Sequence, residues 1–274
     1  MNIQHSDIIL VGGGIAGMTA AAAFGTAGFS VALVDPSLAK QSNDLRSTAF
    51  LQPARALLAR AGLWDLFEPH AAPLKIMRII DAGGPPDAAA VSADFDASEI
   101  GDGPFGWNLP NMAIRQAALA RLAQLPNVTQ YPDTRFARLT PRRVEARVAL
   151  SDGTQLSAKL LIGADGRKSA VRKAAGIGTK IHRYGQKALV FTVRHAPPHN
   201  DCSTEVHLSG GPFTMVPLPD ADDGHRSAIV WMETSAEAAR LMQLDEAAFN
   251  DAASHRSAGV LGPLALTSPT FQKS

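Results

Sequence analysis

Residues 7–17 read DIILVGGGIAG. The apolar run at residues 8–11 predicts a short strand that is buried on both faces. Gly12, Gly14 and Gly17 follow at the G-x-G-x-x-G spacing of dinucleotide-binding turns. The first glycine allows a tight turn, the second lets a pyrophosphate approach the backbone, and the third lets the next helix pack closely on the strand. The segment therefore predicts a strand, a phosphate-binding turn and a helix, in that order.

The residues after this turn extend the same pattern. A helix from Ile15 to about residue 27 would point its N-terminal amides at a phosphate, and residues 30–34 predict a second strand. Asp35 then ends that strand, where a carboxylate can accept hydrogen bonds from ribose hydroxyls. A glycine-rich turn that binds nothing is the less favoured interpretation, because all the parts occur in order. The candidate dinucleotide-binding residues are Gly12, Gly13, Gly14, Ala16, Gly17 and Asp35.

Composition limits the class of protein. The 274 residues are 46% hydrophobic and 19% charged, enough for one large domain or two ordinary ones. A net charge of +1 argues against nucleic acid as a partner. Cys202 is the only cysteine, which excludes an internal disulfide and a cysteine-based metal site and suits a reducing compartment. The first apolar run is too short for a secretory signal, so we expect a cytoplasmic protein, soluble or peripheral on a membrane.

A local basic stretch departs from this even balance of charge. The solvated face of two strands is the preferred interpretation, and contact with anionic lipid headgroups stays open. The stretch contains Arg135, Arg138, Arg142, Arg143 and Arg147.

The remaining pattern predicts a change of architecture near residue 179. Before it we expect helices over 49–61 and 111–124, the second capped by Asn111, and an irregular excursion over 88–103. The expected strands there span 75–81, 136–140, 143–150, 154–158 and 159–162. After it we expect antiparallel strands at 187–194, 204–208, 213–217 and 227–232, followed by helices at 236–244 and 245–254.

A second motif, GADGRKSAVR at residues 163–172, follows the predicted strand 159–162. Asp165 is the one Asp-Gly aspartate in the sequence that follows a buried strand and precedes a helix start. Its carboxylate could accept bonds from ribose hydroxyls or order water on a pyrophosphate. Taken alone, an ordinary Asp-Gly turn is the better interpretation.

Together the two motifs resemble a known family. Residues 163–172 match the D-G-x-x-S-x-x-R element of the para-hydroxybenzoate-hydroxylase-like, FAD-dependent monooxygenases. Residues 44–49, DLRSTA, resemble the segment whose arginine lies along the flavin in that family. Residues 184–190 and 211–219, with Ile229-Val230-Trp231, are similar to the ubiquinone-biosynthesis branch, which hydroxylates polyprenylated phenols. The resemblance runs from residue 5 to about residue 254.

The resemblance implies an α/β fold. A Rossmann-like FAD-binding domain with a β-meander would span residues 1–70 and 104–178. A substrate domain with an antiparallel sheet (α+β) would span 71–103 and 179–274. FAD would be the cofactor, with NAD(P)H as co-substrate, and O2 and a lipid-tailed phenol would be the other substrates.

The resemblance also implies roles for two arginines. Arg46 would bind flavin ribityl or phosphate oxygens through its planar donor fork, and Arg115 would contact the flavin from the start of a helix. A surface position is the alternative for each. Because the flavin carries the chemistry, we expect no catalytic side chain.

No metal site is expected either. His195 and His199 have the spacing of a helical metal pair, but Pro197 and Pro198 exclude that helix and favour a loop. His182 and His207 have no visible partner.

The substrate should occupy an apolar pocket. We expect the sheet that contains Phe213, Met215 and Trp231 to line it, because a prenylated phenol needs a largely apolar cleft.

One family element is missing from its expected place, the third, Gly-Asp-containing motif that closes over the pyrophosphate. We therefore expect the C-terminal part of the FAD domain to be absent, as in a truncated chain. The alternatives are a non-catalytic truncated fragment, a flavin-free binding subunit, another FAD-dependent aromatic hydroxylase and, more weakly, an NAD-dependent dehydrogenase. Contact with the inner membrane or with a quinone-biosynthesis complex stays open.

Overall fold

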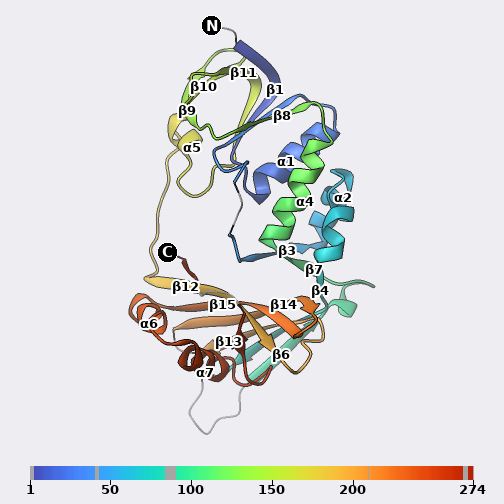
Figure 1. The fold of residues 1–274 in the computed structure, drawn as a ribbon, viewed down its shortest axis with the longest axis vertical. Coiled ribbons are helices and arrows are strands. Elements are labelled where there is room, and N and C mark those ends of the chain that lie inside the picture. Colours follow the sequence, from blue (N-terminus) through green and yellow to red (C-terminus); the bar gives the residue numbers. More distant parts are fainter. Residues whose placement is uncertain (1–2, 41–42, 84–90, 209, 268–270, 274) are drawn as a thin grey trace. The chain divides into compact units, whose positions relative to one another are not determined.

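The chain folds as two units, each assembled from stretches that are distant in sequence (Figure 1). The computed structural model describes residues 3–40, 43–83, 91–208, 210–267 and 271–273. The first unit comprises Met1–Asn43, Pro53–Pro69 and Met112–Ile181. The second comprises Asp44–Gln52, His70–Asn111 and His182–Ser274.

A six-stranded sheet organises the first unit, in the order β8-β2-β1-β11-β10-β9. Its strands are β1 (Ile3–Val11), β2 (Val31–Asp35), β8 (Val128–Pro132), β9 (Phe136–Pro141), β10 (Ala146–Leu150) and β11 (Gln155–Gly163). Strands β8, β2, β1 and β11 are parallel to one another. Strands β10 and β9 then continue the sheet with antiparallel pairing. Val11 is opposite Gly163, so the chain leaves β1 and β11 side by side at one edge.

Helices complete the first unit. They are α1 (Ile15–Thr26), α2 (Gln52–Arg60), α3 (Trp64–Phe67), α4 (Asn111–Ala123) and α5 (Ala170–Ala174), with a 3₁₀ turn η1 (Glu68–His70). Figure 1 shows α1 and α4 side by side next to the sheet. The middle of the sheet is fully apolar, because β1 and β2 contribute the consecutive buried runs Ile8–Val11 and Val31–Val34.

Three expectations for this part of the chain were wrong in detail. Residues 154–158 and 159–162 form the single strand β11, which pairs with β10 through its first half and with β1 along its length. The edge strand β8 was not expected, because its sequence VTQYP is short and largely polar. The helix expected from residue 49 begins at Gln52, because the preceding residues pair with a strand of the second unit.

An eight-stranded sheet forms the larger part of the second unit, in the order β16-β12-β15-β14-β13-β5-β6, with β17 also pairing with β12. Its strands are β5 (Ile76–Asp81), β6 (Val91–Asp96), β12 (Gln186–His195), β13 (Cys202–Leu208), β14 (Gly211–Ala221), β15 (Gly224–Thr234), β16 (Ala265–Leu266) and β17 (Phe271–Lys273). A small antiparallel sheet in the order β3-β7-β4 accompanies it, built from β3 (Ser47–Leu51), β4 (Ala72–Leu74) and β7 (Gly106–Pro110). The 3₁₀ turn η2 (Ala97–Glu99) follows β6.

Two helices cover one face of the large sheet, α6 (Ser235–Leu241) and α7 (Glu246–Arg256). Thr234 and Asp245 cap them by accepting hydrogen bonds from amides three residues later. Aromatic rings fill the space between helices and sheet, with Phe191 5.0 Å from Phe249 between ring centroids. The core of the second unit therefore lies on this face.

The face of the sheet that carries Phe213, Met215 and Trp231 is packed against the helices, so these side chains line no pocket, and a substrate pocket formed by this sheet stays a prediction. Phe213, Met215 and Trp231 are 0%, 1% and 3% exposed, and all three belong to the core beneath the helices. Successive residues of a strand point to opposite faces, so the other face of β14 and β15 carries residues such as Thr214 and Val230, which are only partly buried.

The excursion expected at 88–103 contains the edge strand β6. Val91, Ala93 and Phe95 alternate with polar residues, a strand pattern, although every side chain of β6 is exposed. Arg78 on β5 donates two hydrogen bonds to Asp94, at 2.8 and 2.7 Å. Residues 88–90 of that expected segment lie outside the described residues.

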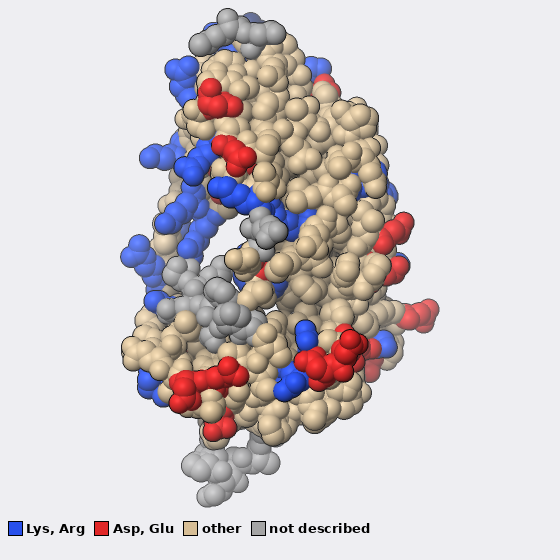
Figure 2. Space-filling model, in the orientation of Figure 1, with Lys and Arg blue, Asp and Glu red and all other residues tan. Residues whose placement is uncertain are grey.

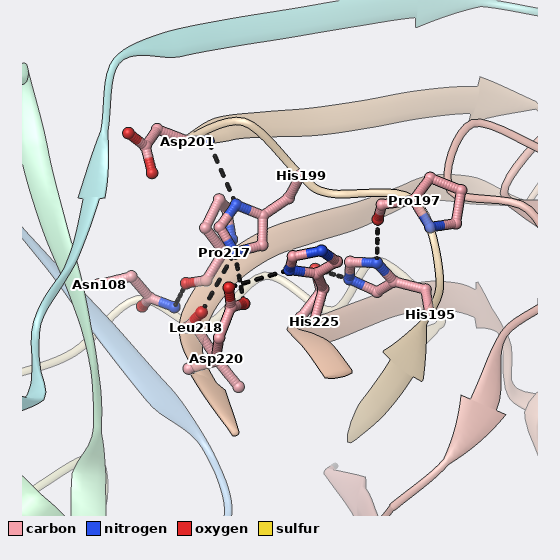
Figure 3. A network of polar contacts seen from close by, with 10 residues as sticks. Asn108, His195, Pro197, His199, Asp201, Pro217, Leu218, Asp220 and His225 are labelled. Carbon is pink, nitrogen blue, oxygen red and sulfur yellow. Dashed lines mark hydrogen bonds and ion pairs between the residues drawn. The ribbon is translucent and has the colours of Figure 1, made fainter. Parts of the chain in front are cut away.

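Three imidazoles gather at one end of the large sheet (Figure 3). His195 is the last residue of β12 rather than part of a loop, whereas His199 lies in the loop that follows, and His225 lies near the start of β15. Their ring centroids are 6.1–6.2 Å apart. Asp220 accepts a hydrogen bond of 2.9 Å from His225 Nδ1. His207, expected to lack a partner, lies 2.7 Å from Glu205.

The described histidines, cysteines and acids form no group that could hold a metal ion. In the part of the chain that the structure describes, no helix is long and apolar enough to cross a membrane.

The arginine-rich stretch lies on β9, β10 and their turns. Four of its members, Arg135, Arg138, Arg142 and Arg143, are exposed, whereas Arg147 is partly buried and pairs with Glu145. Figure 2 shows Lys and Arg gathered along the side of the first unit where these strands and α5 lie. This arrangement fits the solvated strand faces expected from the sequence.

Candidate dinucleotide site

Two glycines of the first motif are required by the fold itself. Gly12 has φ +116°, and a Cβ there would lie 2.2 Å from the carbonyl oxygen of Ala164. A Cβ on Gly17 would lie 1.8 Å from the carbonyl oxygen of Gly12. Gly12 thus lets the turn pack against the second motif, and Gly17 lets α1 pack against the turn. Only glycine permits such close approach.

Gly14 differs from both. Its φ of −74° is open to any residue, and a Cβ built on it meets nothing within 4 Å. It is the N-cap residue of the twelve-residue α1, yet α1 has no side-chain cap and no acidic residue in its first turn. The first amides of a helix need partners, and an anion supplies them. The space beside Gly14 thus fits a phosphate group. Ala16, in the first turn of α1, is also exposed.

Asp35 lies directly beside this turn. Its Oδ2 accepts a hydrogen bond of 2.7 Å from the Gly13 amide, and its Oδ1 accepts one of 2.6 Å from the Ser37 amide. A carboxylate offers about four acceptor positions, so two remain for ribose hydroxyls. Asp35 therefore both orders the glycine turn and keeps capacity for a ligand.

The second motif lies against the first. The Ala164 amide donates to the carbonyl of Val11, at 2.7 Å. Asp165 Oδ2 accepts from the amides of Ala170 and Val171, at 2.7 and 3.1 Å, and Oδ1 accepts from the Ser169 hydroxyl at 2.5 Å. The carboxylate thus holds the start of α5.

These bonds also act on the charge of Asp165. Partial burial would raise the pKa of the carboxyl group, but the hydrogen bonds from Ser169, Val171 and Ala170 outweigh it and lower the pKa. Ser169 accepts in turn from the Arg172 amide, and the Arg172 guanidinium donates to the carbonyl of Arg167. The residues of the motif therefore bind one another, and a nucleotide contact of Asp165 stays a prediction.

Arg46 lies in the second unit, immediately before β3. Its guanidinium forms a two-point ion pair with Asp44, with Nε 2.5 Å from Oδ1. Burial would raise the pKa of Asp44, but hydrogen bonds from Arg46 and Asn111 lower it, and the same pair raises the pKa of Arg46. The structure thus groups Arg46 with Asp44 and Asn111, and its contact with flavin stays a prediction.

Asn111 was expected to cap α4 with its side chain. Its Nδ2 instead donates to Asp44 at 2.9 Å, and its Oδ1 accepts from the Thr48 hydroxyl at 2.7 Å. The side chain therefore joins the start of α4 to the Asp44 segment and β3, a long-range role that helix-capping rules cannot foresee.

Arg115, on α4, reaches the glycine turn. Its Nη1 donates to the carbonyl of Gly13 at 3.1 Å, and its Nη2 faces carbonyls of the loop after β2. A cavity of about 390 Å³ adjoins this arginine, with Leu38, Lys40 and Met112 among its walls. Sequence reasoning missed this loop, because backbone carbonyls carry no residue-type signal.

Comparisons with known proteins agree with this geometry. Ubiquinone hydroxylase UbiL of Rhodospirillum rubrum is 35% identical over 270 residues, covering 97% of this chain and 61% of the relative. The 3-demethoxyubiquinol 3-hydroxylase of Escherichia coli is 28% identical, covering 90% of this chain and 62% of the relative. Their names confirm the resemblance to the ubiquinone branch. The chain spans about three fifths of the length of these curated relatives.

The fold has solved counterparts as well. The crystal structure of Pseudomonas aeruginosa PqsL in complex with 2-aminobenzoylacetate matches with a TM-score of 0.79 at 21% identity, covering 99% of this chain and 74% of that one. This likeness confirms the expected α/β fold. The profile of the FAD binding domain family matches residues 5–263, which confirms the expectation of FAD. The glycine turn is open to a phosphate and Asp35 lies beside it, which agrees with this match. Because the family profile matches nearly the whole sequence, the chain belongs to the FAD-binding domain family.

Proposed function

We propose that the protein is an FAD-dependent monooxygenase that hydroxylates a polyprenylated phenol in ubiquinone biosynthesis, with NAD(P)H and O2 as co-substrates. The first unit would bind FAD, and the second would bind the phenol. The observation that carries the cofactor assignment is the uncapped start of α1 beside Gly14. The names of the curated relatives support the choice of substrate.

Each proposed FAD contact has a physical reason in the first unit. The amides at the start of α1 would bind the pyrophosphate, with Gly14 leaving room for its oxygens. Asp35 would orient the adenosine ribose through its remaining acceptor positions. Asp165, whose pKa is lowered by its hydrogen bonds, would offer an acceptor beside the same turn.

Bound FAD would take electrons from NAD(P)H and react with O2, and the protein would position the phenol and exclude water. Arg46 would place a permanent positive charge near the flavin, because a guanidinium stays protonated at any physiological pH. Its ion pair with Asp44 fixes the direction of the donor fork.

The direct test begins with binding. The full chain is titrated with FAD and followed by quenching of flavin fluorescence, and it should bind FAD saturably but weakly. Oxidation of NADH or NADPH is then followed with a demethoxyubiquinol, and mass spectrometry should show the addition of one oxygen atom. Failure to bind FAD would contradict the cofactor assignment. Oxygen transfer only to phenols without a prenyl tail would instead indicate another aromatic hydroxylase.

A membrane-surface location is the natural companion of this proposal, because a polyprenylated substrate partitions into the bilayer. We propose that the protein works in the cytoplasm and reaches the inner membrane peripherally. Co-sedimentation with vesicles that contain the substrate, compared with vesicles that lack it, tests this. If the protein binds neither set of vesicles, the result counts against this location.

A further inference from the structure

Arg115 directs both terminal amino groups of its guanidinium at backbone carbonyls. Nη1 donates to Gly13 at 3.1 Å. Nη2 faces three carbonyls of the loop after β2, namely Ser37, Leu38 at 3.1 Å and Lys40 at 3.4 Å. The acceptors belong to two segments, the glycine turn and the loop, and Arg115 joins them from α4.

Gly13 is consequently held at both of its backbone polar groups. Its amide donates to Asp35, and its carbonyl accepts from Arg115. Asp35 also accepts from the Ser37 amide, and Arg115 donates to the Ser37 carbonyl. These four contacts close a ring of polar interactions through two backbone segments and two side chains of opposite charge.

Only a planar fork can serve such a ring. A guanidinium presents donors in fixed, divergent directions, whereas a lysine ammonium is a single point at the end of a flexible chain. Fixing the turn and the loop before a ligand arrives removes part of the ordering cost that binding would otherwise carry.

We infer that Arg115 is a positioning residue for the adenosine end of FAD: it holds the turn of Gly12–Gly14 and the loop 37–40 in the binding conformation instead of bonding to the phosphates. The inference rests on the proposed FAD site and changes the role that the family resemblance implied for Arg115. It assigns the affinity effect of Arg115 to the geometry of its fork, not to its charge.

The test separates geometry from charge. The full chain and its variants Arg115→Lys and Arg115→Ala are titrated with FAD, ADP and adenosine by calorimetry. Arg121→Lys is the matched control, because Arg121 lies on the same helix and also donates to a backbone carbonyl, that of Ala61, away from the turn.

Positioning predicts that both Arg115 variants weaken all three ligands by a similar factor. Without the bonds of Arg115, the cost of ordering the turn and the loop falls on binding, and a cost equal to one charge-assisted hydrogen bond corresponds to about a tenfold rise in Kd. Arg121→Lys should bind as the unchanged chain does. If Arg115→Lys binds normally, or if Arg115→Ala weakens ADP and FAD but not adenosine, the effect comes from charge on the phosphates and the inference is wrong.

Amide hydrogen exchange of the ligand-free chain gives an independent measure. Exchange at residues 36–40 should be faster in both Arg115 variants than in the Arg121→Lys control. Unchanged exchange would overturn the inference even where affinity falls. If the unchanged chain binds none of the three ligands, the proposed cofactor assignment fails, and the exchange measurement still decides whether Arg115 orders the loop.

Discussion

Glycines at the start of α1 are present for two different physical reasons. Gly12 and Gly17 are fixed by backbone contacts of 2.2 and 1.8 Å that any Cβ would make, while Gly14 has free space around it. Folding therefore explains two of the three glycines. The third is explained by a ligand whose phosphate needs the space beside the turn.

Gly14→Val should leave folding intact and abolish FAD binding. Valine is a poorer N-cap residue than glycine, so the free energy of unfolding should fall by about 1 kcal/mol, and the open space and permitted φ at this position add no strain. The valine side chain would occupy the position of the pyrophosphate. Thermal unfolding and FAD titration of one sample measure both effects.

Gly12→Ala is the control for this variant. It should lose about 1–3 kcal/mol from backbone strain alone, besides the contact with Ala164. Normal FAD affinity in a folded Gly14→Val chain would remove the reason for assigning this turn to a cofactor.

Arg46→Ala should weaken FAD more than it weakens folding. The ion pair with Asp44 is partly exposed, and such pairs contribute about 0–1 kcal/mol. A lost charge-assisted bond to FAD would cost about 1.5–3 kcal/mol, or roughly ten- to hundredfold in affinity. Comparison of Tm without FAD against Kd for FAD distinguishes the roles. A lower Tm with normal affinity would make Arg46 a structural residue.

At the scale of elements, the end of the paired strands β12 and β15 that carries His195 should respond to pH. His195 is 3% exposed, with Nδ1 2.8 Å from the carbonyl of Pro197 and Nε2 2.9 Å from the Ser227 hydroxyl. Burial, followed by the nearby His199 and His225, lowers the pKa of His195 below its ordinary value of 6.5, against the opposing effects of the Pro197 carbonyl and Asp220.

The sign follows from the neutral form being favoured in the folded state. The stabilisation is complete above pH 6.5 and is lost as the pH falls below that value toward the folded-state pKa. The protection factors of the amides at residues 193–195 and 225–227, corrected for the intrinsic pH dependence of exchange, should therefore fall between pH 7 and about pH 5. A His195→Asn variant should lack this change. An equal response in both proteins would assign it to other groups.

Elements with a strong local pattern could be predicted from the sequence, and those set by tertiary pairing could not. The β1–α1–β2 unit followed from consecutive apolar residues and glycine spacing. The break expected inside β11 was wrong, because one strand pairs in two directions along its length. Phe213 and Trp231 were recognised as apolar strand residues, but the sequence does not say which face of a sheet the helices will cover.

The candidate site shows the same division. Asp35 and Asp165 follow from spacing relative to strands, and the structure places each beside the glycine turn. The grip of Arg115 on carbonyls at Ser37 and Lys40 depends on how α4 packs, and no residue type signals it.

At the scale of the whole molecule, an unpaired strand edge should promote association. Within the described residues, Lys159–Gly163 of β11 has β1 as its one strand neighbour. Leu160 is 48% exposed, and Val144 and Ile177 are 80% and 62% exposed. A groove of about 610 Å³ runs beside this edge. Such an edge is a template for pairing with another chain.

The full chain should therefore form oligomers as its concentration rises, measured by light scattering. Cations that line the groove, among them Arg142, Arg143 and Arg172, repel one another between copies, so salt should increase association. Leu160→Lys should decrease it, because a charged edge residue opposes pairing. A chain that stays monomeric in high salt would show that this edge is protected.

The contrast between Gly14 and its neighbours has a consequence for how this sequence can vary. In a mutational library sorted only for stable expression, position 14 should accept many residues, while positions 12 and 17 should remain glycine. Sorting the same library for retained flavin colour should restore glycine at position 14. The difference between the two surviving populations would then record, position by position, what selection by the cofactor adds to selection by folding.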